Sequence, residues 1–286
     1  MPQELPWYYY NHAMIPTASP HETVDESPLQ RKTVWKAVGG FPLFARWTTD
    51  FDCKTPTQWW YIIKDSPFLL TDVKANYRYK INKGRKHFEV QVIEPTQHAE
   101  AIYQVQAEAY AAYPAKSHPI ADYQHFAEGL HRWQKDVTFA AFSKADGTMA
   151  GYIHVELRKG CVLLSAQKTK PSQEKLQVNA ALVYGLLANY RQELAEGQYI
   201  ADGERSILHE TNFQEYLETY FGFRKAYCRL HILYRPGVRQ LVAFLYPIRG
   251  IFKSAKGSQL FGRIRSVLQM EEIVRADSAS GAAKER

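Results

Sequence analysis

A polar loop late in the chain carries the side chains best suited to proton transfer. The run from Glu204 to Asn212 contains two glutamates and one histidine, namely Glu204, His209 and Glu210. Carboxylates and imidazoles are the usual general bases of enzymes. Surface loops are also polar simply because they face water, so ordinary solvation is the alternative interpretation. The loop is therefore a candidate site for acid–base chemistry.

Two groups of basic residues are candidates for binding anions. Lys168, Lys170 and Lys175 lie within eight residues of one another, and Arg224 and Lys225 are adjacent. Cations gathered in this way attract phosphate groups by charge. A cation at the start of a strand can also stabilise a developing oxyanion. The alternative for both groups is a solvated, charged surface.

Two of the predicted elements are expected to end at or beside a glycine. A short apolar strand begins at Tyr199, and the turn-forming pair Asp202 and Gly203 is expected to break it. Apolar residues at helical spacing predict a helix over 73–83, which Gly84 is expected to end. The other face of that helix is basic, with Lys74, Arg78, Lys80 and Lys83.

A helix and a long strand follow the polar loop. Helical periodicity over 213–221 predicts a helix, with Asn212 as its N-cap and Gly222 at its end. Alternation over 227–234 predicts a half-buried strand. These two elements would place the loop and the pair Arg224–Lys225 at neighbouring ends.

The elements before the loop form a regular series. Asp122 is expected to cap one of the helices, and Asp146 with Gly147 to form a hairpin turn. The predicted elements are a strand over 87–93, helices over 100–113 and 122–133, strands over 137–143, 149–157 and 161–167, a polar loop over 168–173, and a helix over 174–194.

The run "ETNFQEYLETYFGFRKAYC" resembles the last helix and strand of acyltransferases of the GNAT superfamily, and more narrowly of the FemAB-like branch. The basic run "YKINKGRK" is similar to a Lys/Arg-rich helix of FemAB-like proteins, and the predicted element order is that of the GNAT fold. The resemblance covers residues 76–234. It implies an α+β fold with a mixed, mostly antiparallel sheet flanked by helices. An aromatic-rich N-terminal extension and a C-terminal helical tail would be added to it.

The resemblance also implies where an acyl donor binds. In GNAT proteins the carrier lies in a V-shaped cleft between the middle strands, at the N-terminus of the long helix. Lys168, Lys170, Lys175 and Asn179 occupy that region here. The usual glycine-containing pyrophosphate loop is absent from "KTKPSQEKLQVNAAL". FemAB-like proteins also lack it, so both an acyl-CoA, such as acetyl-CoA, and an aminoacyl-tRNA are expected donors.

The implied reaction is transfer of an acyl or aminoacyl group to an amine. By resemblance, the acceptor is an amino sugar of a cell-surface polysaccharide or a cell-wall precursor. Glu204, His209 and Glu210 are then candidates for the catalytic base, and Arg224, Lys225 and Asn212 for substrate binding. No metal is expected, because His118, His125 and His131 show no ligand spacing.

Composition sets the remaining bounds. The 286 residues carry a net charge of +7 and three cysteines without disulfide or metal spacing, which fits a reducing cytoplasm. The first residues show no signal-peptide core, and no apolar run is long enough to span a membrane. The expected organisation is a flexible segment over 1–34, a subdomain over 35–95 that is a possible diverged first GNAT-like lobe, the transferase domain over 96–235, and a basic amphipathic tail over 236–286.

Two other functions fit the same sequence. A non-catalytic GNAT-like scaffold would bind nucleic acid or an anionic membrane through its basic patches, and the missing glycine loop favours it. A peripheral membrane protein would use the basic, apolar segment 240–269 at the inner face of the membrane. Such a segment more often packs on its own domain, which is the favoured interpretation. Neither the oligomeric state nor the acceptor follows from the sequence.

Overall fold

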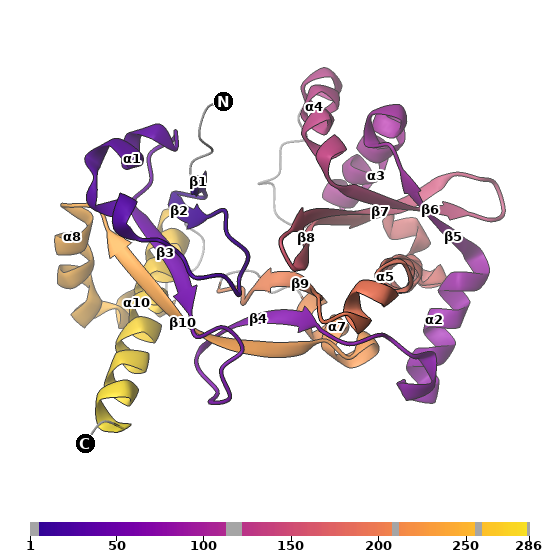
Figure 1. Cartoon of the computed structure of the whole chain (residues 1–286). Coiled ribbons are helices and arrows are strands. Elements are labelled where there is room, and N and C mark those ends of the chain that lie inside the picture. Colours follow the sequence, from indigo (N-terminus) through magenta and orange to yellow (C-terminus); the bar gives the residue numbers. More distant parts are fainter. Residues whose placement is uncertain (1–5, 113–121, 208–211, 255–258, 285–286) are drawn as a thin grey trace. The chain divides into compact units, whose positions relative to one another are not determined.

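The computed structural model describes residues 6–112, 122–207, 212–254 and 259–284 (Figure 1). The chain divides into two compact units. We call residues 62–203 and 212–224 the central unit, and residues 1–61, 204–211 and 225–286 the terminal unit. The division into four consecutive segments that the sequence suggests stays a prediction.

The fold class is α+β, with a mixed and mostly antiparallel ten-stranded sheet, which confirms the sequence prediction. The strands are β1 (Trp7–Tyr10), β2 (Ala13–Pro16), β3 (Phe44–Thr49), β4 (Trp59–Lys64), β5 (Phe88–Ile93), β6 (Val137–Ser143), β7 (Met149–Arg158), β8 (Cys161–Thr169), β9 (Tyr199–Glu204) and β10 (Arg224–Tyr234). Their order is β1-β2-β3-β10-β4-β9-β8-β7-β6-β5.

In the central unit, β5 to β8 form an antiparallel meander and β9 joins β8 in parallel. The helices of this unit are α2 (Ala75–His87), α3 (Ala99–Ala111), α4 (Tyr123–Leu130), α5 (Val178–Asn189), α6 (Arg191–Ala195) and α7 (Phe213–Phe221). Short 3₁₀ turns are η2 (Leu70–Asp72), η3 (Pro95–His98), η4 (His131–Lys135) and η5 (Pro171–Leu176). Asp122 caps α4 as predicted, because its Oδ1 accepts a hydrogen bond from the backbone N–H of His125 at 3.0 Å.

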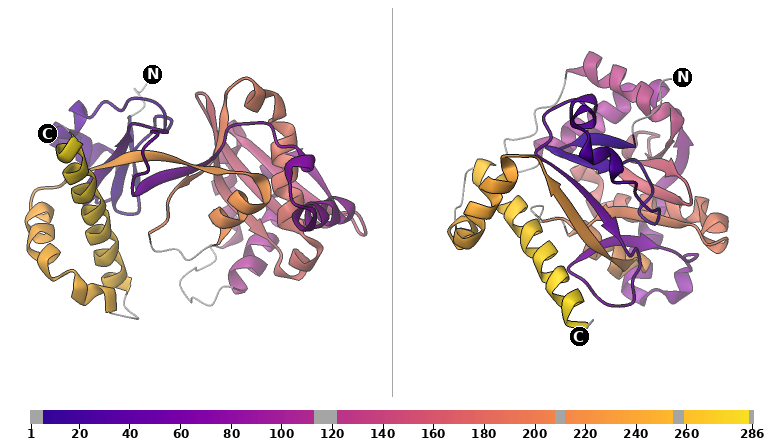
Figure 2. Two further views of the ribbon diagram at one scale, coloured as in Figure 1. Left: turned by 90° about the horizontal axis from the view of Figure 1, so that it is seen from below. Right: turned by 60° about the vertical axis from the view of Figure 1, so that its left-hand side comes forward.

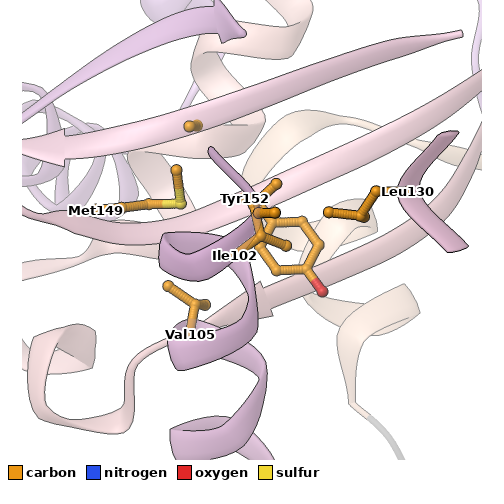
Figure 3. Close-up of a cluster of buried hydrophobic side chains, with 7 residues drawn as sticks. Ile102, Val105, Leu130, Met149 and Tyr152 are labelled. Atoms are coloured by element: carbon orange, nitrogen blue, oxygen red, sulfur yellow. The ribbon is translucent and has the colours of Figure 1, made fainter. Parts of the chain in front are cut away.

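The two faces of this meander pack against different helices, because alternate residues of a strand point to opposite faces. Figure 3 shows Ile102 and Val105 of α3 directed toward Met149 and Tyr152 of β7, with Leu130 beside them. The opposite face packs on α5, where Phe139 of β6 meets Tyr190, the residue that follows the helix. The apolar residues Ile102, Val105 and Ala109 of α3 are therefore buried.

Three predicted boundaries were wrong. The helix α2 passes through Gly84 to His87, since Gly84 serves a close helix contact rather than a stop. The strand β9 passes through Asp202 and Gly203, where Gly203 adopts a φ of 88° inside the strand. The long helix begins at Val178, because η5 occupies the preceding residues and Gln177 has a φ of 67°.

The terminal unit contains β1, β2 and β3 with β10, where β3 pairs antiparallel with β10. Where a flexible segment was expected, the chain forms β1, β2, η1 (Ser27–Gln30) and α1 (Lys32–Ala37). Their core contains Trp7, Met14, Leu29, Val34 and Ala45. A flexible segment was expected because these residues include many polar side chains and prolines. The few apolar side chains among them are buried and hold the segment in place.

The C-terminal part of the terminal unit is helical, with α8 (Val238–Leu245), η6 (Tyr246–Ile248), α9 (Gly250–Ser254) and α10 (Gln259–Lys284). The helix α10 continues to Lys284, within the tail that the sequence predicts over 236–286. Figure 2 shows α10 beside β3 and β10, and Tyr234 of β10 donates a hydrogen bond to Glu271 of α10 at 2.9 Å. Among the described residues, no helix is both long and apolar enough to cross a membrane.

Candidate functional site

The strands β8 and β9 separate soon after they meet. Their parallel ladder joins three residue pairs, and the last pair is Leu163 with Ala201. Beyond it, β8 stays paired with β7 on its other side as far as Thr169, which lies opposite Gly151. The edge of β8 that faces β9 is therefore outside this ladder from Leu164 onward. A splayed parallel pair of this kind is the V-shaped feature that the sequence resemblance implies.

Asp202 lies at the point where the two strands separate. It follows Ala201 directly and is half-buried on β9. Burial raises the pKa of its carboxyl to about 7, because a charged carboxylate loses hydration there. The side chain of Gln214 forms a hydrogen bond that opposes this rise. A carboxyl with this pKa can accept or release a proton at neutral pH, which makes Asp202 the best placed proton carrier of the central unit.

The sequence did not single out Asp202, because an Asp-Gly pair is a turn signal. The partner residue Gln214 is held in place by α7, which starts one residue earlier and ends at Gly222 as predicted. Gly222 has the positive φ, 66°, that such a stop requires. Asn212 occupies the N-cap position of α7 as predicted, but its side chain makes no capping hydrogen bond.

A polar pair lies on β8 and the first turn of α5. The Gln167 Nε2 donates a hydrogen bond to the Asn179 Oδ1 at 2.8 Å. The Gln167 Oε1 is buried and accepts no hydrogen bond from the described part of the chain. A buried acceptor without a donor costs free energy, so a ligand N–H group would be stabilised here. Asn179, a predicted donor-binding residue, is therefore part of a polar site.

The three predicted lysines do not gather at that pair. Lys168 follows Gln167 on β8 and so points to the opposite face, where its Nζ lies 5.4 Å from the ring centre of Tyr110. Burial lowers the pKa of Lys168. Lys170 forms an ion pair with Glu108 of α3 at 3.2 Å. Lys175 lies exposed in η5.

The first turn of α5 is closely contacted by α2. A Cβ added to Gly84 would lie 2.4 Å from the backbone oxygen of Gln177 and 3.0 Å from the backbone nitrogen of Ala181. The helix backbones touch at this place, so only glycine fits. The start of α5 is therefore packed against a helix on one side and preceded by a 3₁₀ turn, rather than by a glycine loop. A carrier would be held here by side chains and not by a backbone cradle.

The predicted substrate cations have different surroundings. In the central unit, the Arg224 Nε donates a hydrogen bond to the Asp65 Oδ2 at 2.9 Å, so its charge is matched by a carboxylate. In the terminal unit, Lys225 and Arg205 lie over the ring of Trp60, with their charged atoms 4.7 Å and 4.3 Å from its centre. This pairing could not be predicted from the sequence, because it joins three separate segments. Two cations on one indole ring make a second candidate contact for an anion.

Glu204, the first predicted base, belongs to a network in the terminal unit. Its Oε2 is paired with Arg46 of β3, and its Oε1 accepts a hydrogen bond from the Tyr61 hydroxyl at 2.9 Å. Thr48 lies 3.4 Å from the same hydroxyl. Burial lowers the pKa of Arg46, whose guanidinium lies 5.7 Å from the ring centre of Trp59. Because both carboxylate oxygens have a hydrogen-bonding or ionic partner, this arrangement is typical of a side chain that stabilises the fold.

His209 and Glu210, the other predicted bases, lie outside the described residues. Within the described ranges, no group of three His, Cys, Asp or Glu side chains has the proximity that metal ligation requires.

The strand order, the antiparallel meander and the splayed β8–β9 pair define a GNAT-like acyltransferase fold. Solved structures with similar folds include L-PGS from Bacillus licheniformis, with a TM-score of 0.50, 14% identity, and coverage of 86% of this chain and 85% of that one. They also include the C-terminal domain of a protein described as a lysylphosphatidylglycerol synthetase from Agrobacterium fabrum, with a TM-score of 0.51, 12% identity, and coverage of 84% and 82%. A structure of FemX gives a TM-score of 0.48 at 9% identity, with coverage of 74% and 70%. No protein-family model and no curated protein matches the sequence.

Proposed function

We propose that this protein transfers an acyl or aminoacyl group from an activated carrier to a nucleophile, with Asp202 as the proton acceptor. The observation that carries the proposal is a half-buried carboxyl with a pKa of about 7 where β8 and β9 separate. The GNAT-like fold supports it, because the sequence resemblance implies that the carrier lies between the middle strands, which here are β8 and β9.

The reaction needs little covalent help from the protein. The nucleophile attacks the carbonyl carbon of the carrier ester or thioester, the carrier oxygen or sulfur leaves, and Asp202 accepts the proton that the nucleophile loses. A carboxyl with a pKa of about 7 is ionised in roughly half of the molecules at neutral pH and is therefore ready to accept it. Gln214 orients the carboxyl through its hydrogen bond.

The donor would lie along β8 and the first turn of α5. Gln167 offers an unmet hydrogen-bond acceptor to an N–H group of the donor, and Asn179 fixes the orientation of the Gln167 amide. Lys175 is exposed beside this turn and would meet a phosphate of the carrier. The close contact of Gly84 with Gln177 leaves no glycine-lined cradle for a pyrophosphate, which favours an aminoacyl-tRNA over an acyl-CoA as donor.

The acceptor class follows from two considerations. The sequence resemblance implies an amine of a cell-surface sugar or cell-wall precursor. The similar Agrobacterium fabrum domain is described as part of a lysylphosphatidylglycerol synthetase, a name that implies a phosphatidylglycerol hydroxyl as acceptor. Both chemistries require one proton to leave the nucleophile, so both fit Asp202. An acceptor panel should contain amino sugars, lipid-linked precursors and phosphatidylglycerol.

The direct test is a transfer assay with labelled donors. The full-length protein is incubated with acetyl-CoA, longer acyl-CoAs or a mixture of charged tRNAs, together with the acceptor panel, and labelled product is separated. The proposal expects transfer from at least one donor and loss of about 100-fold or more in rate for Asp202→Asn. Absence of transfer from every donor, or an unchanged rate for the variant, would contradict it.

A non-catalytic scaffold remains the second candidate, supported by the basic helix α2. Lys74, Arg85 and Lys86 are exposed at the two ends of this helix. A scaffold that binds nucleic acid through these residues would bind charged and uncharged tRNA equally well, with strong dependence on salt. It would also be insensitive to Asp202→Asn, which separates it from the transferase.

A further inference from the structure

The helix α8 is apolar on two sides. On its inner side, Val242 is buried in a cluster with Phe252 of α9 and Leu268 of α10, and Val238 and Leu245 pack against that cluster. These residues recur at spacings of three and four, as expected for the face of a helix that packs on its own unit. The inner side of the segment therefore packs on its own unit, which is one of the two interpretations that the sequence allows for 240–269.

A second set of apolar side chains in the same segment faces outward. They come from α8, η6, α9 and the start of α10, and each is between 43% and 74% exposed: Leu241, Phe244, Ile248, Ile251 and Phe261. We call these five residues the outer face. Figure 2 shows α8 beside α10 in the terminal unit, and the five side chains are exposed there. Single exposed apolar residues are ordinary, but a consecutive set from packed helices indicates a contact surface.

The stretch of sequence that carries the outer face is basic. From residue 235 to residue 270 the sequence has no Asp or Glu and seven Lys or Arg. Arg239, Arg263 and Arg265 are exposed. Arg249 pairs with Glu272 of α10 at 3.2 Å, so its charge is matched by a carboxylate. Apolar side chains among exposed cations complement an anionic lipid surface, which offers both an apolar layer and phosphate groups.

We propose that the outer face docks the protein on an anionic lipid bilayer. Phe244 and Ile251, the most exposed of the set, would enter the boundary between headgroups and acyl chains. The exposed arginines would lie at the level of the lipid phosphates. Pro247 in η6 interrupts the helices, so the segment lies along the surface. This proposal rests on the surface of the terminal unit alone and does not depend on the transferase reaction.

Vesicle flotation of the full-length protein tests this proposal. Vesicles of phosphatidylcholine alone are compared with vesicles that also contain phosphatidylglycerol, at low and high salt. The expected result is flotation only with the anionic vesicles, weakening as salt rises. Each cation near the surface contributes about fivefold to the partition coefficient.

The decisive variant is the pair of changes Phe244→Glu and Ile251→Glu, which removes two apolar groups and adds two negative charges. The partition coefficient should fall by about tenfold or more. The matched control is the pair Val92→Glu and Leu157→Glu, which changes charge equally at exposed strand positions of the central unit. The control should float like the wild type, and far-ultraviolet circular dichroism confirms that both variants are folded.

Three outcomes would overturn the proposal. The wild type fails to float with anionic vesicles, or it floats equally well with neutral ones, or the control pair loses binding as strongly as the outer-face pair. If the wild type ignores vesicles but sediments as a dimer that Phe244→Glu disrupts, the outer face binds a second copy of this chain instead.

Discussion

At the scale of single residues, two carboxyl groups on β9 have opposite surroundings. Asp202 has one identified hydrogen-bond partner, Gln214, and a pKa raised to about 7 by burial. Glu204 has an ion pair to Arg46 and a hydrogen bond from Tyr61. A raised pKa favours proton exchange at neutral pH, whereas full engagement favours a structural role. These surroundings are the basis for proposing Asp202 as the proton acceptor, whereas Glu204 holds Arg46 and Tyr61 together inside the terminal unit.

The pKa of Asp202 predicts how stability varies with pH. The carboxyl has an ordinary pKa of 3.8 when unfolded and about 7 when folded. Between these values the folded state binds more protons, so the wild type loses stability as pH rises from about 4 to about 7. Asp202→Asn lacks this loss. Urea unfolding should show little difference near pH 4, and a variant more stable by on the order of 4 kcal/mol at pH 8. A difference that does not change with pH would contradict the raised pKa.

Glu204→Gln tests the structural assignment. The change leaves the Arg46 charge without its anionic partner in a part-buried place, so the free energy of unfolding should fall by about 1–3 kcal/mol. The rate of transfer per folded molecule should stay within about threefold of the wild type, because the base is elsewhere. A rate reduced by 100-fold in folded protein would instead return the role of base to Glu204.

At the scale of elements, sequence periodicity predicted the helix and strand boundaries that depend on residues close together in the sequence. The strand β6 has the expected bounds, β7 and β8 extend only one or two residues beyond theirs, and α4 begins after the expected cap. Two glycines that were predicted to end or break an element lie inside one. Gly84 lies inside α2 because another helix backbone touches it, and Gly203 lies inside β9 at a positive φ. The Gly84 contact joins residues far apart in the sequence, and an Asp-Gly pair with a positive φ is locally typical of a turn, so the start of α5 and the position of Asp202 inside β9 could not be predicted.

Gly84→Ala tests the contact between α2 and α5. The added Cβ would meet the Gln177 oxygen at 2.4 Å, so the variant should lose about 1–3 kcal/mol of stability although alanine favours helices. The control is Gly262→Ala in α10, where a Cβ meets nothing within 4 Å and a gain of up to about 1 kcal/mol is expected. Equal, positive changes at both sites in chemical denaturation would show that the helices do not touch.

At the scale of the whole molecule, the net charge of +7 is the property that bears most on donor choice. A basic protein that receives an aminoacyl group from tRNA must first bind the RNA backbone. The helix α2 presents Lys74, Arg85 and Lys86 for this purpose. Of the basic face that the sequence predicts, only Lys74 is exposed, whereas Arg78, Lys80 and Lys83 are half-buried and Lys80 donates a hydrogen bond to the Tyr220 hydroxyl at 2.7 Å.

Charge reversal on α2 should therefore weaken tRNA binding. The pair Lys74→Glu and Lys86→Glu is expected to raise the Kd for tRNA by roughly tenfold or more at low salt, and to reduce the slope of log K against log salt by about two. Lys159→Glu with Lys135→Glu, at two other turns of the central unit, is the matched control. Filter binding over a salt series measures both quantities, and equal effects of the two pairs would show that binding is spread over the whole surface.

The proposal that Asp202 accepts the proton is tested most directly by the pH dependence of single-turnover transfer. The wild type, Asp202→Asn and Asp146→Asn are compared. Asp146 is an exposed hairpin carboxylate whose hydrogen bonds with Thr148 lower its pKa, and it serves as the control. We predict that the wild-type rate rises with pH, with a midpoint at about 7, and then levels off. The control should follow the same curve, and Asp202→Asn should be slower by about 100-fold or more, without that midpoint. A rate that ignores pH between 5 and 9, or that survives in Asp202→Asn, would contradict the role assigned to this carboxyl.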